Sequence, residues 1–348
     1  MQRGDETLEA ILMDRIRIGL YGVNGHQIHR EALSLHTAEI VAVAAFPDHI
    51  AAELGQKVPG LRCHDTLDDL LADEAVQLVS LCSPRRREQA SDAVKCLTAG
   101  RHVYAEKPCA MTEKDLDLIL AAAERSGCQF HEMAGTALEA PYLAMASIAR
   151  SGRLGPVVQV LAQKSYPYYE GRPQDEDVDG GLTLQVGVHA FRMIEHVAGT
   201  RIAEVAAFET RLGNPAEGNL KMAVSIAARL ENGGVASVLA NYLNQPGFGK
   251  WGNETLRIFG TRGFVEAVDG GARTRLVIGD RDLGALPDAG GSQSFLGLYL
   301  ESLLGRGSMP FSLEEEVHPT RMIIKAREIA RKSSAAVERS LCTENTHS

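Results

Sequence analysis

The chain has 348 residues, of which 45% are hydrophobic and 23% charged, and a formal net charge of −9 at pH 7. This length accommodates two domains of about 150 residues, each able to bury a core. The acidic balance argues against nucleic acid or an anionic membrane as the main partner, because both bind clustered positive charge.

No apolar run approaches the roughly 20 residues that cross a bilayer, and residues 1–14 lack the apolar core of a secretory signal. We therefore expect a cytoplasmic protein without a membrane partner. The six cysteines have no CxxC spacing, which favours reduced thiols. Cys63-His64 and the pair His26 and His29 have no second cluster at metal-ligand spacing, so we predict no metal site.

Strands and helices alternate over residues 15–135. Strands are predicted at 16–21, 39–45, 75–81, 102–105 and 128–133. Helices are predicted to open at Gly25 and His26 and to span 48–56, 87–98 and 113–126, with capping boxes beginning at Thr66 and Thr112. The alternation predicts an N-terminal dinucleotide-binding Rossmann domain (1–135) with a doubly wound parallel sheet.

The pattern changes over residues 136–348. A helix is predicted at 141–150, followed by strands at 157–165, 202–212, 222–230, 235–242, 254–259, 264–268 and 274–278. Further helices are predicted at 184–198, 294–304 and 313–333. Apolar and polar residues alternate in several strands, which predicts a C-terminal α+β domain with a large, mostly antiparallel open sheet. We expect this domain to bind substrate and, through the outer face of its sheet, to form a homo-oligomer, a dimer or tetramer.

The turn after the first strand contains Gly22, Asn24, Gly25 and His26. Glycines at such a turn let the backbone approach a pyrophosphate. An NAD site normally has an acid at the end of the second strand to bind the ribose, and this sequence has Ala45-Phe46-Pro47 there. The choice between NAD and NADP therefore stays open.

Glu106-Lys107-Pro108 ends the strand at 102–105. Proline restricts the residue before it to extended backbone, so Lys107 is presented at a strand end in one orientation. Carboxyl ends of strands carry the chemistry of open α/β sheets. The alternative is a solvated lysine beside a turn.

In its glycine turn, in 99–108 (AGRHVYAEKP), in 150–155, in 179–189 and in 259–263, the chain resembles the Gfo/Idh/MocA family of oxidoreductases. The resemblance implies that Lys107 and His189 are catalytic and that Gln185 replaces the family's aspartate. A glutamine there should leave His189 a weaker base, with positions 185 and 189 on one helical face. The residues implied for cofactor binding are Gly22, Asn24, Gly25, His26, Phe46, Ser83, Pro84, Arg85, Glu106 and Lys107.

Other departures concern the loop after 75–81 and the pocket wall. That loop reads Pro84-Arg-Arg-Arg without the family's histidine, and its arginines are either anion contacts or a solvated helix flank. Leu138 or a neighbour replaces a family arginine. Tyr166, Tyr168, Tyr169 and Arg172 are candidates for the wall of the substrate pocket or for loop packing.

The resemblance implies an NAD(P)-dependent oxidoreductase that transfers hydride between nicotinamide and a sugar, polyol or related hydroxyl or keto compound. One alternative is a non-redox reaction, such as elimination or glycoside cleavage, with tightly bound NAD. Another is a non-catalytic protein that binds a dinucleotide or sugar, which the residues at 45, 46 and 185 would favour.

Overall fold

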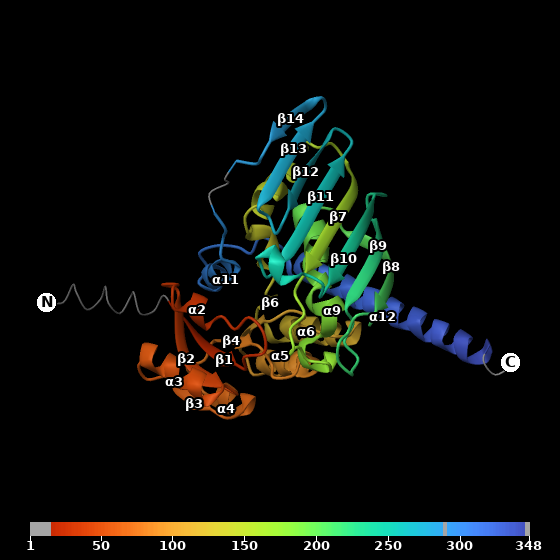
Figure 1. Ribbon diagram of the computed structural model, residues 1–348. Coiled ribbons are helices and arrows are strands. Elements are labelled where there is room, and N and C mark those ends of the chain that lie inside the picture. Colours follow the sequence, from red (N-terminus) through yellow and green to blue (C-terminus); the bar gives the residue numbers. More distant parts are fainter. Residues whose placement is uncertain (1–14, 288–290, 345–348) are drawn as a thin grey trace. The chain divides into compact units, whose positions relative to one another are not determined.

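The computed structural model describes residues 15–287 and 291–344 (Figure 1). They form two compact units. Unit 1 ends at Met133 and resumes at Ser294–Glu316, and unit 2 comprises Ala134–Gln293 and resumes at Val317. The functional roles assigned above to residues 1–135 and 136–348 stay predictions.

A six-stranded parallel sheet forms the centre of unit 1, in the order β3-β2-β1-β4-β5-β6. The strands are β1 (Ile16–Tyr21), β2 (Ala38–Ala44), β3 (Arg62–His64), β4 (Leu78–Leu81), β5 (His102–Ala105) and β6 (Phe130–Glu132). The predicted doubly wound sheet is confirmed, although β3 has no apolar run and was not predicted. Strand order changes direction between β1 and β4, where open α/β sheets bind ligands beyond their carboxyl ends.

The helices of unit 1 are α2 (His29–Ala32), α3 (Asp48–Lys57), α4 (Leu67–Ala72), α5 (Gln89–Thr98), α6 (Glu113–Ser126) and α11 (Phe295–Leu303). Both predicted capping boxes are confirmed, since the Thr66 and Thr112 hydroxyls accept from the amides of Asp69 and Asp115. The predicted helix from Gly25 and His26 is wrong, because α2 begins only at His29. The Ile28 amide donates to the Gln27 side chain at 2.9 Å, so the chain bonds locally before the helix starts.

Unit 2 contains an eight-stranded sheet in the order β14-β13-β12-β11-β7-β10-β9-β8 (Figure 1). Its strands are β7 (Val157–Ser165), β8 (Ile202–Thr210), β9 (Ala223–Leu230), β10 (Val235–Asn241), β11 (Asn253–Gly260), β12 (Gly263–Val268), β13 (Arg273–Ile278) and β14 (Arg281–Gly284). Only β7 and β10 pair in parallel among the described strands of this sheet. The mostly antiparallel sheet is therefore confirmed, and β14 is an additional short edge strand.

The helices α7 (Tyr142–Arg150), α9 (Gly181–Gln185) and α10 (Gly187–Arg192) contact the large sheet, α7 at β12, α9 at β9 and β10, and α10 at β7 and β10. The other helices of the unit are α8 (Glu176–Asp179) and α12 (Leu313–Glu344), whose first residues belong to unit 1. The predicted continuous helix over 184–198 is wrong. It is interrupted at Val186, where the amide of His189 bonds to the carbonyl of Val186 three residues back, and it ends in a π-helix, η3 (Met193–Val197).

The face of the large sheet that points away from its core carries exposed apolar side chains. Phe208, Leu239 and Leu161 are 70%, 43% and 37% exposed. Ser225 pairs with both Phe208 and Leu239, so these side chains form one row across β8, β9 and β10. We call this surface, defined by Phe208, Leu239 and Leu161, the outer sheet face.

Candidate functional site

The glycine turn follows β1 and lies against the loops after β4 and β5. Gly22 and Gly25 have φ angles of +66° and +124°, a region that favours glycine. A Cβ on Gly22 would be 2.1 Å from the carbonyl oxygen of Cys82, and one on Gly25 would be 2.8 Å from Cγ of Glu106. Glycine is therefore required at both positions for two reasons. A side chain would clash with neighbouring atoms, and the φ angle is positive.

Glu106 connects this turn to the strand end that carries Lys107. One Glu106 oxygen accepts from the His26 amide at 2.6 Å and lies 3.0 Å from His26 Nδ1. The other accepts from the Lys107 amide at 3.0 Å and lies 3.8 Å from Lys107 Nζ. Glu106 and Lys107 are 1% and 3% exposed, so the alternative of a solvated lysine is excluded.

The surroundings of Glu106 keep it ionised. Burial alone would raise the pKa of this carboxyl, but the hydrogen bond from His26 and the positive charge of Lys107 outweigh burial and hold the pKa well below its usual range. The ammonium of Lys107 thus has a fixed negative partner. The His26 ring is 73% exposed, whereas the Glu106 carboxylate that it contacts is buried.

Arg86 and Gln89 support the same edge of the sheet through hydrogen bonds. Arg86 is 1% exposed and donates to the Asn24 carbonyl and to Gln89 Oε1, so it is neither a solvated flank nor an exposed anion contact. Gln89 in turn donates to the carbonyls of Glu106 and Pro108. Arg85 and Pro84 are exposed, whereas the hydroxyl of the buried Ser83 donates to Asp92 at 2.8 Å.

The end of β2 lacks an acidic side chain, as the sequence indicates. Ala45 has a φ of +54°, which is uncommon for a residue with a Cβ, and Phe46 is half-buried. Phe46 lines a pocket of about 440 Å³ together with one face of α3 and the end of β3. Its lining residues are Val43, Phe46, Asp48, Ala51, Ala52, Gly55, Cys63, His64 and Asp65. The titratable groups among them are two carboxylates, a thiol and an imidazole.

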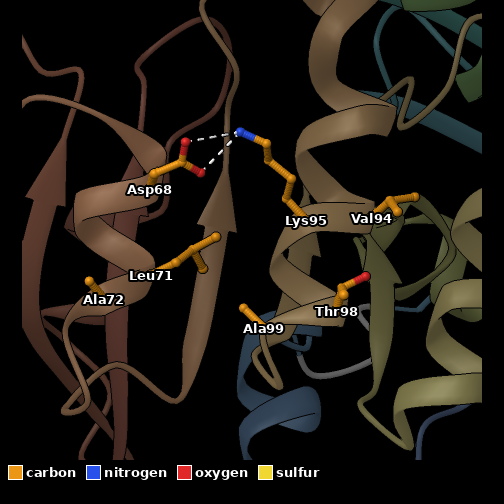
Figure 2. A pocket seen from close by; sticks show the side chains of 7 residues that line it. All are labelled: Asp68, Leu71, Ala72, Val94, Lys95, Thr98 and Ala99. Atoms are coloured by element: carbon orange, nitrogen blue, oxygen red, sulfur yellow. Dashed lines mark hydrogen bonds and ion pairs between the residues drawn. The ribbon is translucent and has the colours of Figure 1, made fainter.

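A pocket of about 500 Å³ lies elsewhere in unit 1, between α4 and α5. Figure 2 shows Asp68 and Lys95 pointing toward each other from these helices, with Lys95 Nζ 3.0 Å and 3.2 Å from the two carboxylate oxygens. Its lining residues are Asp68, Leu71, Ala72, Val94, Lys95, Thr98 and Ala99. None of the site residues named from the sequence lines this pocket.

A buried acid pair continues the network beyond Lys107 within unit 1. The Cys109 amide donates to Glu132 Oε1 at 2.7 Å, and the Glu132 amide donates to Glu316 Oε1 at 2.7 Å. His131 Nδ1 lies 2.6 Å from the other oxygen of Glu316. Burial raises the pKa of Glu316, and the histidine opposes that rise.

In unit 2, His189 and Gln185 belong to α10 and α9 and contact different neighbours. Nδ1 of His189 lies 3.4 Å from the Thr136 hydroxyl. Oε1 of Gln185 accepts from the Tyr242 hydroxyl at 3.0 Å and lies 3.5 Å from Nη1 of Arg172. Because a guanidinium has only donors, the atom of Gln185 that faces Arg172 is its oxygen, and the amide nitrogen, a donor, points away.

Tyr242 was not identified from the sequence because it lies 57 positions from Gln185. It is 1% exposed, and burial raises its pKa well above the usual value, with the charge of Asp179 adding to the rise. The hydroxyl therefore stays protonated and donates. At position 185, where the resemblance implies an aspartate, this chain has an amide whose oxygen accepts from Tyr242.

The predicted pocket-wall residues have different environments. Arg172 is 5% exposed, with its guanidinium 3.7 Å and 4.6 Å from the ring centroids of Tyr242 and Tyr169 and its Nη1 4.0 Å from Asp179. Tyr168 bonds to Gln174. Tyr169 is 44% exposed, and Tyr166 lies with its ring centroid 6.5 Å from that of His189.

Within residues 15–287 and 291–344 there is no group of three or more metal-ligating acids, histidines or cysteines. The same residues contain no helix that is both long and apolar enough to cross a membrane.

Two family models match the chain. A model described as "Oxidoreductase family, NAD-binding Rossmann fold" matches residues 16–133, and the GFO/IDH/MocA C-terminal domain matches residues 142–266.

Several curated proteins are similar in sequence. The oxidoreductase YrbE of Bacillus subtilis is 26% identical over 57% of each chain, and myo-inositol 2-dehydrogenase of Thermotoga maritima is 22% identical over 55% of this chain and 58% of that one. Trans-1,2-dihydrobenzene-1,2-diol dehydrogenase of Bos taurus is 24% identical over 73% and 74%. The matched part thus spans little more than half the length of the first two relatives.

Solved structures agree in fold. The aldose-aldose oxidoreductase of Caulobacter crescentus has a TM-score of 0.79 and 17% identity, covering 92% of this chain and 98% of its own. The WlbA dehydrogenase of Bordetella pertussis, solved with NADH and UDP-GlcNAcA, has a TM-score of 0.77 and 20% identity over 92% and 96%.

Proposed function

Because the chain belongs to the Gfo/Idh/MocA family of oxidoreductases, we propose that it is an NAD(P)-dependent oxidoreductase acting on a hydroxyl or keto group of a sugar, polyol or related compound. The observation that carries this proposal is Lys107. Lys107 is 3% exposed, beside the glycine turn and 3.8 Å from a buried carboxylate. Burying a charged lysine costs free energy, and buried ionisable groups of this kind are concentrated at functional sites.

The glycine turn fits the pyrophosphate of a dinucleotide. Gly25 and His26 are exposed there with Arg85, and the carboxylate of Glu106 is covered and paired. This arrangement removes negative charge from the surface and leaves cationic or uncharged groups, as an anion site requires. Asn24, whose side-chain nitrogen donates to the carbonyls of Ser83 and Pro84, fixes the shape of the turn.

When bound, the nicotinamide supplies the carbon that accepts or donates hydride. Lys107 is assigned to the substrate oxygen, where its ammonium lowers the free energy of a developing alkoxide. His189 exchanges the hydroxyl proton at Nε2, since its Nδ1 lies beside Thr136. Gln185 accepts from Tyr242 and faces Arg172. It therefore adds no negative charge that would strengthen His189 as a base, as a carboxylate at position 185 would.

We infer a preference for NAD over NADP. The ribose of a Rossmann-bound dinucleotide lies beyond the end of the second strand, here Ala45 and Phe46. The pocket beside Phe46 includes Asp48 and Asp65 among its lining residues and has no lysine or arginine among them. A 2′-phosphate would meet negative charge there, whereas the 2′-hydroxyl of NAD would not.

A thermal-shift comparison with NAD, NADH, NADP and NADPH, each at about 1 mM, tests the proposal. A ligand at about 100 times its Kd adds roughly 2.7 kcal/mol of stability, so we expect the melting temperature to rise by several degrees with NAD and NADH. A screen of sugars and polyols for a change in nicotinamide absorbance follows. A shift without net reduction of NAD would favour the non-redox alternative. No shift in nucleotide-free protein would contradict nucleotide binding and favour the non-catalytic one.

We also propose that the outer sheet face joins copies of the chain into a homo-oligomer. Phe208, Leu239 and Leu161 would bury their exposed apolar area there. Light scattering after gel filtration should give a multiple of 37.5 kDa for the protein, and close to 37.5 kDa for Leu161→Lys combined with Leu239→Lys. The control is Leu118→Lys on α6, where Leu118 is 47% exposed. A monomeric unmodified protein would refute this assignment.

A further inference from the structure

Trp251, the only tryptophan of the chain, lies in the segment between β10 and β11 and is 56% exposed. Its ring centroid is 6.0 Å from that of Tyr166 and 6.0 Å from that of Tyr169, with interplanar angles of 39° and 45°. The two tyrosines follow β7. We call Tyr166, Tyr169 and Trp251 the aromatic shelf.

The backbone beneath the shelf is fixed by hydrogen bonds. Asn244, 8% exposed, donates from Nδ2 to the carbonyls of Lys250 and Trp251 at 2.9 Å and 3.0 Å. Its amide donates to the carbonyl of Tyr166 at 3.1 Å. One buried asparagine thus joins the two segments that carry the shelf, so the backbone of both segments is held in place before any ligand arrives. Preorganised contacts lose less entropy on binding.

The shelf adjoins the residue assigned to proton exchange. The ring of Tyr166 meets that of His189 edge to face, at a centroid distance of 6.5 Å and an angle of 73°. Tyr166 therefore lies between His189 and Trp251 within unit 2. A ligand whose hydroxyl reaches His189 can extend over Tyr166 toward the exposed face of Trp251.

The two cations that stack on the shelf tyrosines lie beside carboxylates. Lys164, 5.2 Å from the centroid of Tyr166, forms an ion pair with Glu254. Arg172 is stacked on Tyr169 and lies 4.0 Å from Asp179. Their charges are compensated within the protein, so the surroundings favour a neutral ligand over a carboxylate or phosphate.

We propose that Trp251 is a substrate-binding residue that stacks on the apolar face of a neutral, hydroxylated six-membered ring, a pyranose or cyclitol. The inference rests on the proposed function and specifies its substrate class. Ring C–H groups attached to oxygen-bearing carbons carry partial positive charge, and the face of an indole is negative. A rigid ring presents these groups together, whereas an open-chain polyol must lose rotational freedom to do so. Trp251 therefore selects cyclic substrates over open-chain ones.

The emission of the only tryptophan reports directly on this contact. The holoenzyme with saturating NAD is titrated with D-glucose and myo-inositol, and in parallel with D-sorbitol, which has as many hydroxyl groups as myo-inositol. We expect saturable quenching or a spectral shift with at least one ring compound, and no saturable change with sorbitol over the same range. Absence of a saturable response to both rings, or an equal response to sorbitol, overturns the proposal.

Kinetics on the substrate found by the nicotinamide screen provide the second test. Trp251→Ala should raise KM for a ring substrate by about tenfold, the loss expected for one aromatic stacking contact, with kcat changed far less. Trp251→Phe should restore most of the affinity, and Leu212→Ala, at an 85% exposed position, should change neither constant. An unchanged KM in Trp251→Ala refutes the proposal.

The two proposals fail in different ways. If NAD raises the melting temperature and turnover is measured, but Trp251→Ala leaves KM unchanged, only the role of the shelf is wrong. If no dinucleotide binds, the proposed oxidoreductase fails, and the emission titration, repeated without NAD, still reports whether the shelf binds a ring.

Discussion

Replacing Lys107 by alanine is expected to lower kcat by about 10²- to 10³-fold, the usual loss when one preorganised charge-stabilising donor is removed. The reason is that its ammonium, 3% exposed and 3.8 Å from Glu106, is assigned to the oxygen that gains negative charge. NAD should still raise the melting temperature, because the glycine turn keeps its own contacts. Steady-state kinetics and thermal shift on the same preparation measure both effects.

Two further variants separate charge from folding at this position. Lys107→Met keeps the length of the stem and removes the charge, so it should lose the same activity as Lys107→Ala with less loss of stability. Lys114→Ala on α6 removes an exposed lysine and should retain full kcat. If Lys107→Met kept more than half of the activity, the assignment of Lys107 as a catalytic residue would be wrong.

Glu106→Gln is expected to destabilise the protein by about 3 kcal/mol or more at neutral pH, the usual cost of removing one partner of a buried ion pair. The substituted amide would present donor hydrogens to a site where His26 and Lys107 already donate. Urea unfolding of both proteins measures the difference. Glu53→Gln on the surface of α3 is the control, and it should change stability little.

The difference between Glu106→Gln and the unmodified protein should depend on pH. The pKa of Glu106 is lower in the folded protein than its usual value of 4.5. The unfolded chain therefore takes up the proton first as pH falls, so ionised Glu106 contributes its full stabilisation above pH 4.5 and progressively less below it. A difference that stayed constant from pH 6 to pH 3 would show that the charge of Glu106 is not what stabilises the turn.

Much of the fold was predictable from local patterns. The strands β1, β5 and β7 have the predicted bounds, because each is marked in the sequence by a continuous apolar run or a clear alternation. The capping box at Thr112 predicted the start of α6 correctly, and Gly127 predicted its end. The interruption at Val186 was not predictable, because it lies inside an uninterrupted apolar pattern and depends on tertiary contacts.

The candidate site was predictable where the family motifs are, at the glycine turn and at Glu106-Lys107-Pro108. The residues that support it were not. Arg86 was expected to be solvated or to bind an anion, because the sequence cannot indicate that its guanidinium donates a hydrogen bond to the Asn24 carbonyl. Tyr242 and Trp251 act through contacts between segments far apart in the chain, for which neither periodicity nor spacing gives a signal.

The buried acids Glu132 and Glu316 have a consequence for the cooperativity of unfolding. Through them, the amide of Cys109, two residues after Lys107, is connected to the first turn of α12, more than 200 positions later in the sequence. If either segment opened alone, Glu132 or Glu316 would stay buried without the amide that donates to it, which costs free energy. The two segments should therefore open together rather than separately. Their amides would then exchange with solvent at a common rate, which makes the strand end that carries Lys107 one of the last parts of unit 1 to loosen.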